Sequence, residues 1–261
     1  MTPRREVPVL DLFRLDGRTA LVTGASRGLG AAMARALAEA GADVALHASR
    51  PLSPERTREL TSACGGRARV LTADLASRGE AERLADDAIA ALGRIDILVN
   101  NAGIIRRADA DAYPDKDWDD VLMVDLSSVF RLCRSVGRTM LARGSGKIIN
   151  IASMLTFQGG MRVPAYAAAK GGVAQLTKAL ANEWAARGVN VNAIAPGYMR
   201  TDNTQALQDD RPRYEAITAR IPAGRWGEPD DLAGAVVFLA SPASDYIHGY
   251  VLAVDGGWLA R

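Results

Sequence analysis

A glycine-rich turn, Thr23-Gly24-Ala25-Ser26-Arg27-Gly28-Leu29-Gly30, joins a short β-branched run to an alanine-rich segment. Gly24 permits a tight turn, Gly28 lets the backbone approach a pyrophosphate, and Gly30 lets a helix pack closely on a strand. The first turn of the helix would add free amide groups and a partial positive charge. Three glycines alone also fit an ordinary helix start. Their position between the first strand and the first helix favours a dinucleotide site.

Short β-branched runs alternate with longer alanine-rich segments on both sides of this turn. Seven runs are predicted as strands: Thr19–Thr23, Val44–Leu46, Val70–Thr72, Ile95–Val99, Lys147–Ile151, Val189–Ala195 and Val251–Val254. Six segments are predicted as helices: Gly28–Ala40, Pro54–Cys64, Gly79–Leu92, Asp117–Ala142, Pro164–Arg187 and Pro229–Ala240. Seven buried strands separated by helices imply an α/β fold, a single doubly wound Rossmann-type domain with a parallel sheet.

The chain has no linker-like composition shift and no repeat, so residues 1–261 are predicted to form one domain. One segment, residues 198–227, shows two prolines, many charges and mixed periodicity, and no element is predicted there. Its length suits a lid over a site.

Composition excludes several classes of function. With 32 Lys and Arg against 30 Asp and Glu, the net charge of +2 gives no basic surface for nucleic acid or an anionic membrane. The apolar runs are far shorter than the ~18 residues of a membrane span. Two isolated cysteines and an N-terminus with Arg4, Arg5 and Glu6 but no apolar run indicate a reduced, cytoplasmic protein. Two histidines in separate places make no metal site.

Further motifs follow the strands in order. They are Asp74-Leu75, Asn100-Asn101-Ala102-Gly103, Ser153, Tyr166-Ala-Ala-Ala-Lys170 and Pro196-Gly197. With three residues between its first two glycines, the turn and these motifs together resemble the classical short-chain dehydrogenase/reductase family over nearly the whole chain. That resemblance implies a nicotinamide nucleotide in the cleft, with Asp74 on the adenine side and Asn101 and Gly103 under it. The cofactor-binding residues expected are Gly24, Ser26, Arg27, Gly28, Leu29, Gly30, Ser49, Arg50, Asp74, Leu75, Asn101, Ala102, Gly103, Tyr166, Lys170, Pro196, Gly197, Met199 and Thr201.

Ser153, Tyr166 and Lys170 are the predicted catalytic residues. Tyr166 and Lys170 lie four apart on one helix, so their side chains share a face, and Ser153 ends a neighbouring strand. The lysine ammonium would favour the phenolate form of Tyr166, which could then exchange a proton with a substrate hydroxyl or carbonyl. Ser153 would hydrogen-bond the same oxygen. The pattern predicts interconversion of a secondary alcohol and a ketone.

Asp125 is a departure from the family pattern. The resemblance implies an asparagine in a Val-Asn-Leu run, where it helps to hold a water that relays protons to the lysine; here the run is Val124-Asp125-Leu126. If the backbone carbonyl makes that contribution, aspartate can replace asparagine, whereas a role for the side-chain amide would alter the relay. A carboxylate near Lys170 would favour the charged lysine. Asp125 is therefore included among the catalytic residues.

Cofactor choice is expected at the end of the second strand, where a carboxylate would hold the ribose of NAD and cations the 2′-phosphate of NADP. The strand ends His47-Ala48-Ser49-Arg50, without an acid. Arg27 and Arg50 could bind the phosphate, so NADP is favoured while NAD stays possible. An acid introduced at Ala48 is expected to move the preference toward NAD.

Substrate recognition is expected in the loops. Residues 100–107, 157–164, 221–227 and 255–261 look like the branch of the family that acts at carbon 5 of gluconate and of 2-keto-3-deoxygluconate. A site for a polyhydroxy carboxylate is expected to contain an arginine that binds the carboxylate and polar side chains that bind the hydroxyls. The candidate substrate residues are Arg106, Gln158, Arg162 and Tyr198, with Arg107 beside them.

Two other functions stay open: a 3-ketoacyl thioester reductase, which shares these catalytic residues, and a nucleotide-binding sensor without turnover. The helices Asp117–Ala142 and Pro164–Arg187 carry apolar residues beyond one face. These are Val121, Val124, Val129, Leu132, Leu176, Leu180 and Trp184. They are expected to lie either inside the chain or against another subunit, and the family resemblance implies a homotetramer.

Overall fold

The computed structural model describes residues 7–261, and the run with Arg4, Arg5 and Glu6 lies outside the described residues. The seven strands are β1 (Thr19–Val22), β2 (Asp43–Ala48), β3 (Ala68–Thr72), β4 (Ile97–Asn100), β5 (Gly146–Ile151), β6 (Val189–Pro196) and β7 (Val251–Val254). They form one parallel sheet in the order β3-β2-β1-β4-β5-β6-β7. The predicted fold class and all seven strands are confirmed, with ends that move by at most two residues. The two edge strands, however, are only half-buried.

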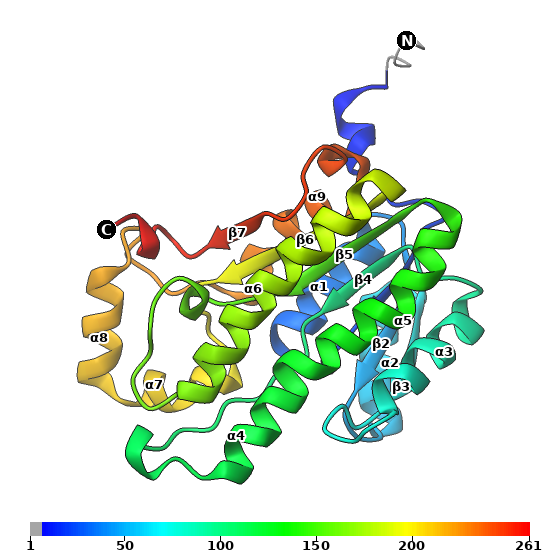
Figure 1. Cartoon of the computed structure of the whole chain (residues 1–261). Helices are drawn as coiled ribbons and strands as arrows, with labels where there is room; N and C mark the ends of the chain where they lie inside the picture. The colour runs from blue at the N-terminus through cyan, green and yellow to red at the C-terminus, as the bar shows by residue number, and fades with distance from the viewer. Residues whose placement is uncertain (1–6) are drawn as a thin grey trace.

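The helices are α1 (Gly28–Glu39), α2 (Pro54–Ala63), α3 (Glu80–Leu92), α4 (Asp115–Leu122), α5 (Ser128–Arg143), α6 (Pro164–Trp184), α7 (Gln205–Asp209), α8 (Arg211–Arg220) and α9 (Ala233–Ala240). They cover both faces of the sheet, α1 and α9 on one side and α3, α5 and α6 on the other (Figure 1).

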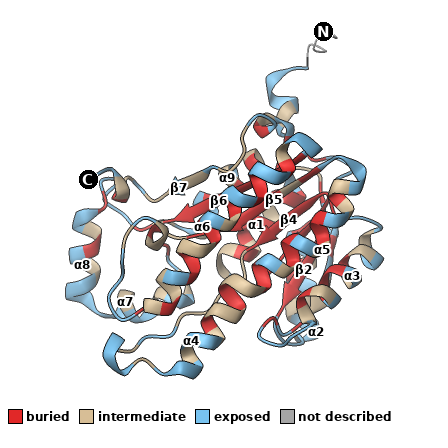
Figure 2. Cartoon of the chain, viewed as in Figure 1, coloured by how far each residue is buried: buried red, intermediate tan, exposed pale blue. Residues whose placement is uncertain are grey.

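Side chains along each strand alternate between two cores. In β1, Ala20 and Val22 pack with Met33 of α1, whereas Leu21 packs in the other core with Leu132 of α5. This is the two-residue period of a strand whose faces are both covered. Buried residues accordingly run along the sheet and the inner sides of the helices (Figure 2).

The long helix predicted over Asp117–Ala142 is not continuous. It begins at Asp115 and is interrupted by a π-helical turn at Met123–Ser127 between α4 and α5. A π turn adds one residue to the helical repeat, and such turns are frequent at functional sites. Here Val124 and Asp125 are buried by it, an arrangement that apolar periodicity does not reveal.

Residues 198–227, for which no element was predicted, contain α7 and α8. The helix α8 begins at the N-cap Asp210 with a proline in its first turn, yet Ile217 is its only buried residue. A short helix with one buried position leaves almost no apolar period in the sequence. Four aromatic rings pack this segment: Tyr214 stacks on Trp226, and Tyr198 contacts Trp226 at a tilt and Trp258 edge-on.

Candidate active site

A cleft of about 690 Å³ opens beside the carboxyl ends of the strands. Its position follows from strand order, because β1 pairs with β2 on one side and with β4 on the other. The connections after these strands therefore leave in opposite directions, and ligands in open α/β sheets bind at such a point.

The glycine-rich turn forms one wall of the cleft. Gly24 and Gly28 both have positive φ, at 63° and 54°, which favours glycine. A side chain at Gly30 would collide with the Gly24 carbonyl oxygen, so this glycine does permit close packing of α1 on β1. Within residues 7–261, the Arg27 side chain makes no capping hydrogen bond to the first turn of α1. The amides of that turn are thus available to an anionic group.

The cleft brings together most of the residues expected from the sequence. Its lining includes Gly24, Ser26, Arg27, Gly28, Leu29, Gly30, Ser49, Arg50, Asp74, Leu75, Asn101, Ala102, Gly103, Arg106, Ser153, Tyr166, Lys170, Pro196, Gly197, Met199 and Thr201. Sequence reasoning missed other lining residues, including His47, Lys116, Asp120, Asp202 and Asn203. A histidine within the apolar run of the second strand was a usable signal for the first of these; nothing local marked the others.

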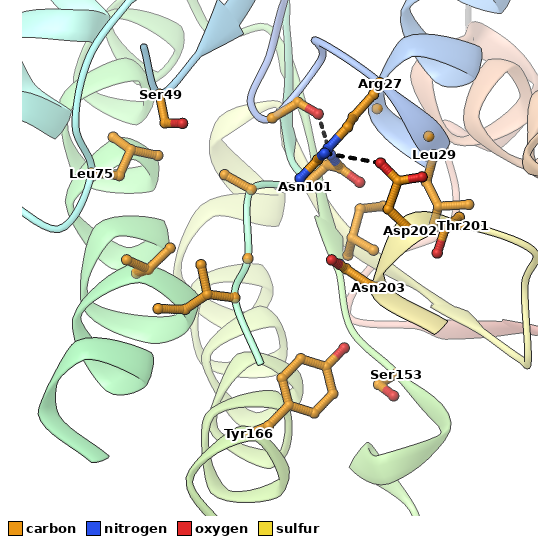
Figure 3. A pocket seen from close by; sticks show the side chains of 18 of the residues that line it. Arg27, Leu29, Ser49, Leu75, Asn101, Ser153, Tyr166, Thr201, Asp202 and Asn203 are labelled. Carbon is orange, nitrogen blue, oxygen red and sulfur yellow. Dashed lines mark hydrogen bonds and ion pairs between the residues drawn. The ribbon is translucent and has the colours of Figure 1, made fainter. Parts of the chain in front are cut away.

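Ser153, Tyr166 and Lys170 converge from β5 and α6. Ser153 and Tyr166 both line the cleft and lie side by side in Figure 3, where the Tyr166 hydroxyl points into the cleft. The Lys170 ammonium lies 5.4 Å from the centre of the Tyr166 ring and donates to the Ile151 carbonyl at 3.0 Å. The Ser153 hydroxyl accepts from the Leu155 amide at 3.2 Å, which holds the side chain at the start of the following turn. The tyrosine thus shares the cleft with the Ser153 hydroxyl and has the Lys170 ammonium beside its ring.

Asp125 lies behind this group, fully buried. One of its oxygens accepts from the Ile104 amide at 2.8 Å, and the other lies 3.4 Å from the Lys170 ammonium. Position 103 requires a glycine, because a Cβ there would lie 2.9 Å from the Asp125 carboxylate. Asp125 thus joins the loop after β4 to the lysine of α6.

Burial and pairing act against each other at this buried ion pair. Burial lowers the pKa of Lys170, but the neighbouring Asp125 and Tyr166 outweigh it and hold the pKa above its ordinary value. Burial raises the pKa of Asp125, which Lys170 and the Ile104 amide oppose. The lysine consequently keeps its proton at neutral pH and acts as a fixed positive charge beside Tyr166.

The two arginines considered for the nucleotide differ in their surroundings. Arg27 pairs with Asp202 at 2.9 Å, so it is held by the segment after β6 (Figure 3). Arg50 is the second residue after β2 and lines the cleft beside Ser49. Ala48, the position chosen for an introduced acid, is buried and does not line the cleft. Ser49, the residue after the strand, does line the cleft and is therefore the better position.

Three of the expected substrate residues do not line the cleft. Tyr198 packs its ring between Trp226 and Trp258, at 5.2 and 4.8 Å between centres. Gln158 accepts from the Trp258 indole at 3.3 Å, and Arg162 pairs with Asp109 at 3.0 Å. Aromatic packing and local pairing hold these side chains elsewhere, and only Arg106 is brought to the cleft.

Within residues 7–261, no group of three or more His, Cys, Asp or Glu side chains is placed to hold a metal ion. In the same part of the chain no helix has the length and apolar character to cross a membrane.

A family model described as enoyl-(acyl carrier protein) reductase matches residues 24–259. The 2-dehydro-3-deoxy-D-gluconate 5-dehydrogenase of Dickeya dadantii is 54% identical over 97% of this chain and 100% of that protein. A Beutenbergia cavernae protein, crystallised with NADP at low occupancy, is 54% identical with a TM-score of 0.92 over 96% of this chain and 100% of the other. A gluconate 5-dehydrogenase of Burkholderia cenocepacia, in complex with NADP and tartrate, is 43% identical with a TM-score of 0.91 over 97% and 100%.

A doubly wound sheet with a glycine-rich cleft and a Ser-Tyr-Lys group defines an oxidoreductase that acts on CH–OH groups. The chain belongs to the short-chain dehydrogenase/reductase family. The resemblance inferred from its sequence motifs is confirmed.

Proposed function

We propose that this protein is an NADP-dependent oxidoreductase that interconverts a secondary alcohol and a ketone on a sugar acid of the gluconate or 2-keto-3-deoxygluconate type. The observation that carries the proposal is the placement of Ser153, Tyr166 and Lys170 opposite the glycine-rich turn in one cleft. The names of the relatives supply the substrate class.

The residues of this chain would bind and polarise the reacting oxygen. Tyr166 exchanges the proton with it, and Ser153 holds it by a hydrogen bond. Lys170 stabilises the phenolate, and Asp125 keeps the lysine charged and in place. A bound nicotinamide supplies or accepts the hydride. The turn amides and cleft volume fit such a nucleotide, since the cleft lies within the ~300–1,000 Å³ typical of cofactor sites.

Arg106 is the proposed contact for the substrate carboxylate. It lines the cleft in the loop after β4 and lies 3.7 Å from Asp117, a distance that leaves its guanidinium able to turn to a second acid. Lys116 lines the same cleft and pairs with Asp120. A carboxylate bound here would gain charge-assisted hydrogen bonds. Residues 198–227 would serve as a lid, with the Arg27–Asp202 pair joining the lid to the glycine-rich turn.

The proposal is tested by incubating the purified protein with NADP or NAD and a panel of sugar acids, following nicotinamide absorbance. Activity is expected with gluconate or 2-keto-3-deoxygluconate, oxidised or reduced at carbon 5 as judged by product analysis. A 3-ketoacyl thioester and a 2-enoyl thioester, each with the reduced cofactor, are included because of the family model's description. Turnover of a thioester alone would overturn the sugar-acid assignment.

Cofactor preference is expected to depend on Arg50 and Ser49. Arg50→Ala should raise Kd for NADP about tenfold and leave Kd for NAD nearly unchanged, because it loses one charge-assisted contact worth about 1.4 kcal/mol. Ser49→Asp should repel the 2′-phosphate and move preference toward NAD. Dissociation constants of both nucleotides for the parent and each variant decide this. An equal change for both nucleotides in Arg50→Ala would make Arg50 an ordinary surface charge.

We also propose a homotetramer. Most of the apolar residues first considered for the interface, including Val121, Val129, Leu132 and Trp184, pack inside the chain and do not support it. Phe130 of α5 supports it better, with 42% of its surface exposed. A mass four times the 27.7 kDa of one chain is expected from light scattering at micromolar concentration. Phe130→Asp should lower that mass, and a monomeric parent protein would contradict the assignment.

A cytoplasmic location is proposed as well, since Cys64 and Cys133 are both free thiols and buried.

A further inference from the structure

His47 is a buried polar side chain at the end of β2, directly under the glycine-rich turn. Only 1% of its surface is exposed, yet it reaches the lining of the cleft. The chemistry proposed for the site makes no use of it. A buried imidazole nevertheless needs partners for both ring nitrogens.

Both ring nitrogens have such partners. Nδ1 lies 3.1 Å from the Gly24 amide nitrogen, and Nε2 lies 2.9 Å from the Ala73 carbonyl oxygen. The Gly24 N–H can only donate and the carbonyl can only accept. Nδ1 must therefore carry the lone pair and Nε2 the proton, which is the neutral Nε2–H tautomer, assigned from its partners.

The bond to Gly24 is one half of a clamp on the first glycine of the turn. The Gly24 carbonyl accepts from the Asn101 side-chain amide at 3.1 Å, so the peptide groups on both sides of this glycine are held. The backbone carbonyl of His47 also accepts from the Ala25 amide at 2.8 Å. Through Ala73, the same imidazole joins the turn to the end of β3, from which Asp74 enters the cleft.

We propose that His47 is a positioning residue that holds the glycine-rich turn in its nucleotide-binding shape, and that it does so only as the neutral imidazole. The inference rests on the nucleotide role proposed above for the cleft. Protonation would direct an Nδ1–H at the Gly24 N–H, two donors face to face. The clamp on Gly24 would then open on that side, and nucleotide affinity would fall.

The burial of His47 and the groups around it set the pH range of this effect. Asp74 lies just after β3, Arg50 lies just after β2, the strand that contains His47, and Arg27 lies in the glycine-rich turn. Burial lowers the pKa of His47 below its ordinary value, against the Ala73 carbonyl and Asp74, which raise it. The neutral form therefore predominates at pH 7 and above, and the change is expected on the acid side of the ordinary histidine range.

The tautomer is tested by nitrogen-15 NMR of the full-length protein without nucleotide. The chain contains two histidines, so a His248→Asn variant assigns the signals. We expect His47 to show a protonated Nε2 and an unprotonated Nδ1 at pH 7.5. An Nδ1–H tautomer, or a His47 that is charged at this pH, would overturn the proposal. This result does not depend on the protein binding any nucleotide.

Nucleotide binding is tested by titrating NADP into the parent, His47→Asn, His47→Leu and the control His248→Asn at pH 8 and pH 5.5. The Asn oxygen can take the place of Nδ1 beside Gly24 and does not titrate in this range. At pH 8 we expect Kd to rise about tenfold in His47→Leu, as for one lost buried bond, and to change less than about threefold in the other two. At saturating nucleotide, kcat should stay near that of the parent.

Acidification should weaken binding more in the parent than in His47→Asn, and titration of the 2′-phosphate cancels in that ratio. Equal Kd values for His47→Leu and the parent, or parallel pH dependence of the parent and His47→Asn, would overturn the proposal. If His47→Leu does not fold, the tautomer and the Asn comparison still decide. A parent protein that binds no NADP at either pH would overturn the proposed function instead.

Discussion

Replacing Tyr166 with phenylalanine is expected to lower kcat roughly a thousandfold, within the range that positioned acid–base groups contribute. The ring and its packing in α6 are kept, and only the hydroxyl that points into the cleft is removed. Kd for NADP should change less than about threefold, because the phosphates would be bound by the turn amides at the far wall. Turnover rates with the best sugar acid measure kcat, and a separate nucleotide titration measures Kd for NADP.

Tyr250→Phe is the matched control for this substitution. Tyr250 is 57% exposed just before β7 and does not line the cleft, so losing its hydroxyl should leave kcat within about twofold. Near-normal turnover in Tyr166→Phe would remove the tyrosine from the chemistry. A parallel loss of nucleotide binding would instead point to a collapsed cleft.

The strands could be predicted from the sequence because the sheet is covered by a core on each face, which requires apolar residues on both sides of most strands. Each strand presents β-branched or aliphatic residues to both faces, and the alanine-rich helices between them are long enough to cover the sheet. The glycine-rich turn was predictable for a similar reason, since Gly24 and Gly30 are required by φ and by close packing. Both signals are local and repeat along the chain.

The features that sequence reasoning missed depend on partners far away in the chain. Arg27 lines the cleft as expected, but its exposed ion pair with Asp202 is not visible in the sequence. Gln158 was predicted to meet substrate, but the indole of Trp258 takes its oxygen. No local pattern announces such pairings. An acid at Ala48 is poorly placed for a different reason, because Ala48 ends β2 with a buried side chain and the next residue, Ser49, is the one that lines the cleft.

Asp125 is a residue whose role could be predicted only in part from the sequence. Its identity as an acid was visible in the sequence, and so was the prospect that it would favour a charged lysine. Its hydrogen bond to Ile104 and its complete burial were not, because they depend on the π turn that interrupts the helix. Asp125 and Lys170 therefore form one buried ion pair, in which each charge partly compensates the burial of the other.

Breaking that ion pair from the lysine side is expected to be costly. Lys170→Met should lower the free energy of unfolding by about 3–5 kcal/mol, the usual cost of leaving a buried charge without its partner, and should reduce kcat by at least about a hundredfold. Urea unfolding of each variant at one protein concentration measures the first quantity, and turnover at saturating nucleotide the second. Asp125→Asn alone should also lower the free energy of unfolding, because Lys170 loses its paired carboxylate, but by less, since the lysine still donates to the Ile151 carbonyl and the amide oxygen can still accept from Ile104.

The double variant Lys170→Met, Asp125→Asn separates stability from catalysis. With no carboxylate left to bury, it should recover most of the lost unfolding free energy while remaining inactive.

The pH dependence of this destabilisation has a definite sign. Burial already raises the pKa of Asp125 and the lysine opposes that rise, so removing the lysine raises the pKa further. A carboxyl whose folded pKa lies above its unfolded pKa stabilises the protein at low pH, and this stability is lost as pH rises through the folded value. Lys170→Met should therefore be closer to the parent at pH 5 than at pH 8, whereas the double variant should show no such difference. A deficit in Lys170→Met that is the same at both pH values, or is not relieved in the double variant, would mean that lost packing of the lysine stem, and not an unpaired Asp125, causes the destabilisation.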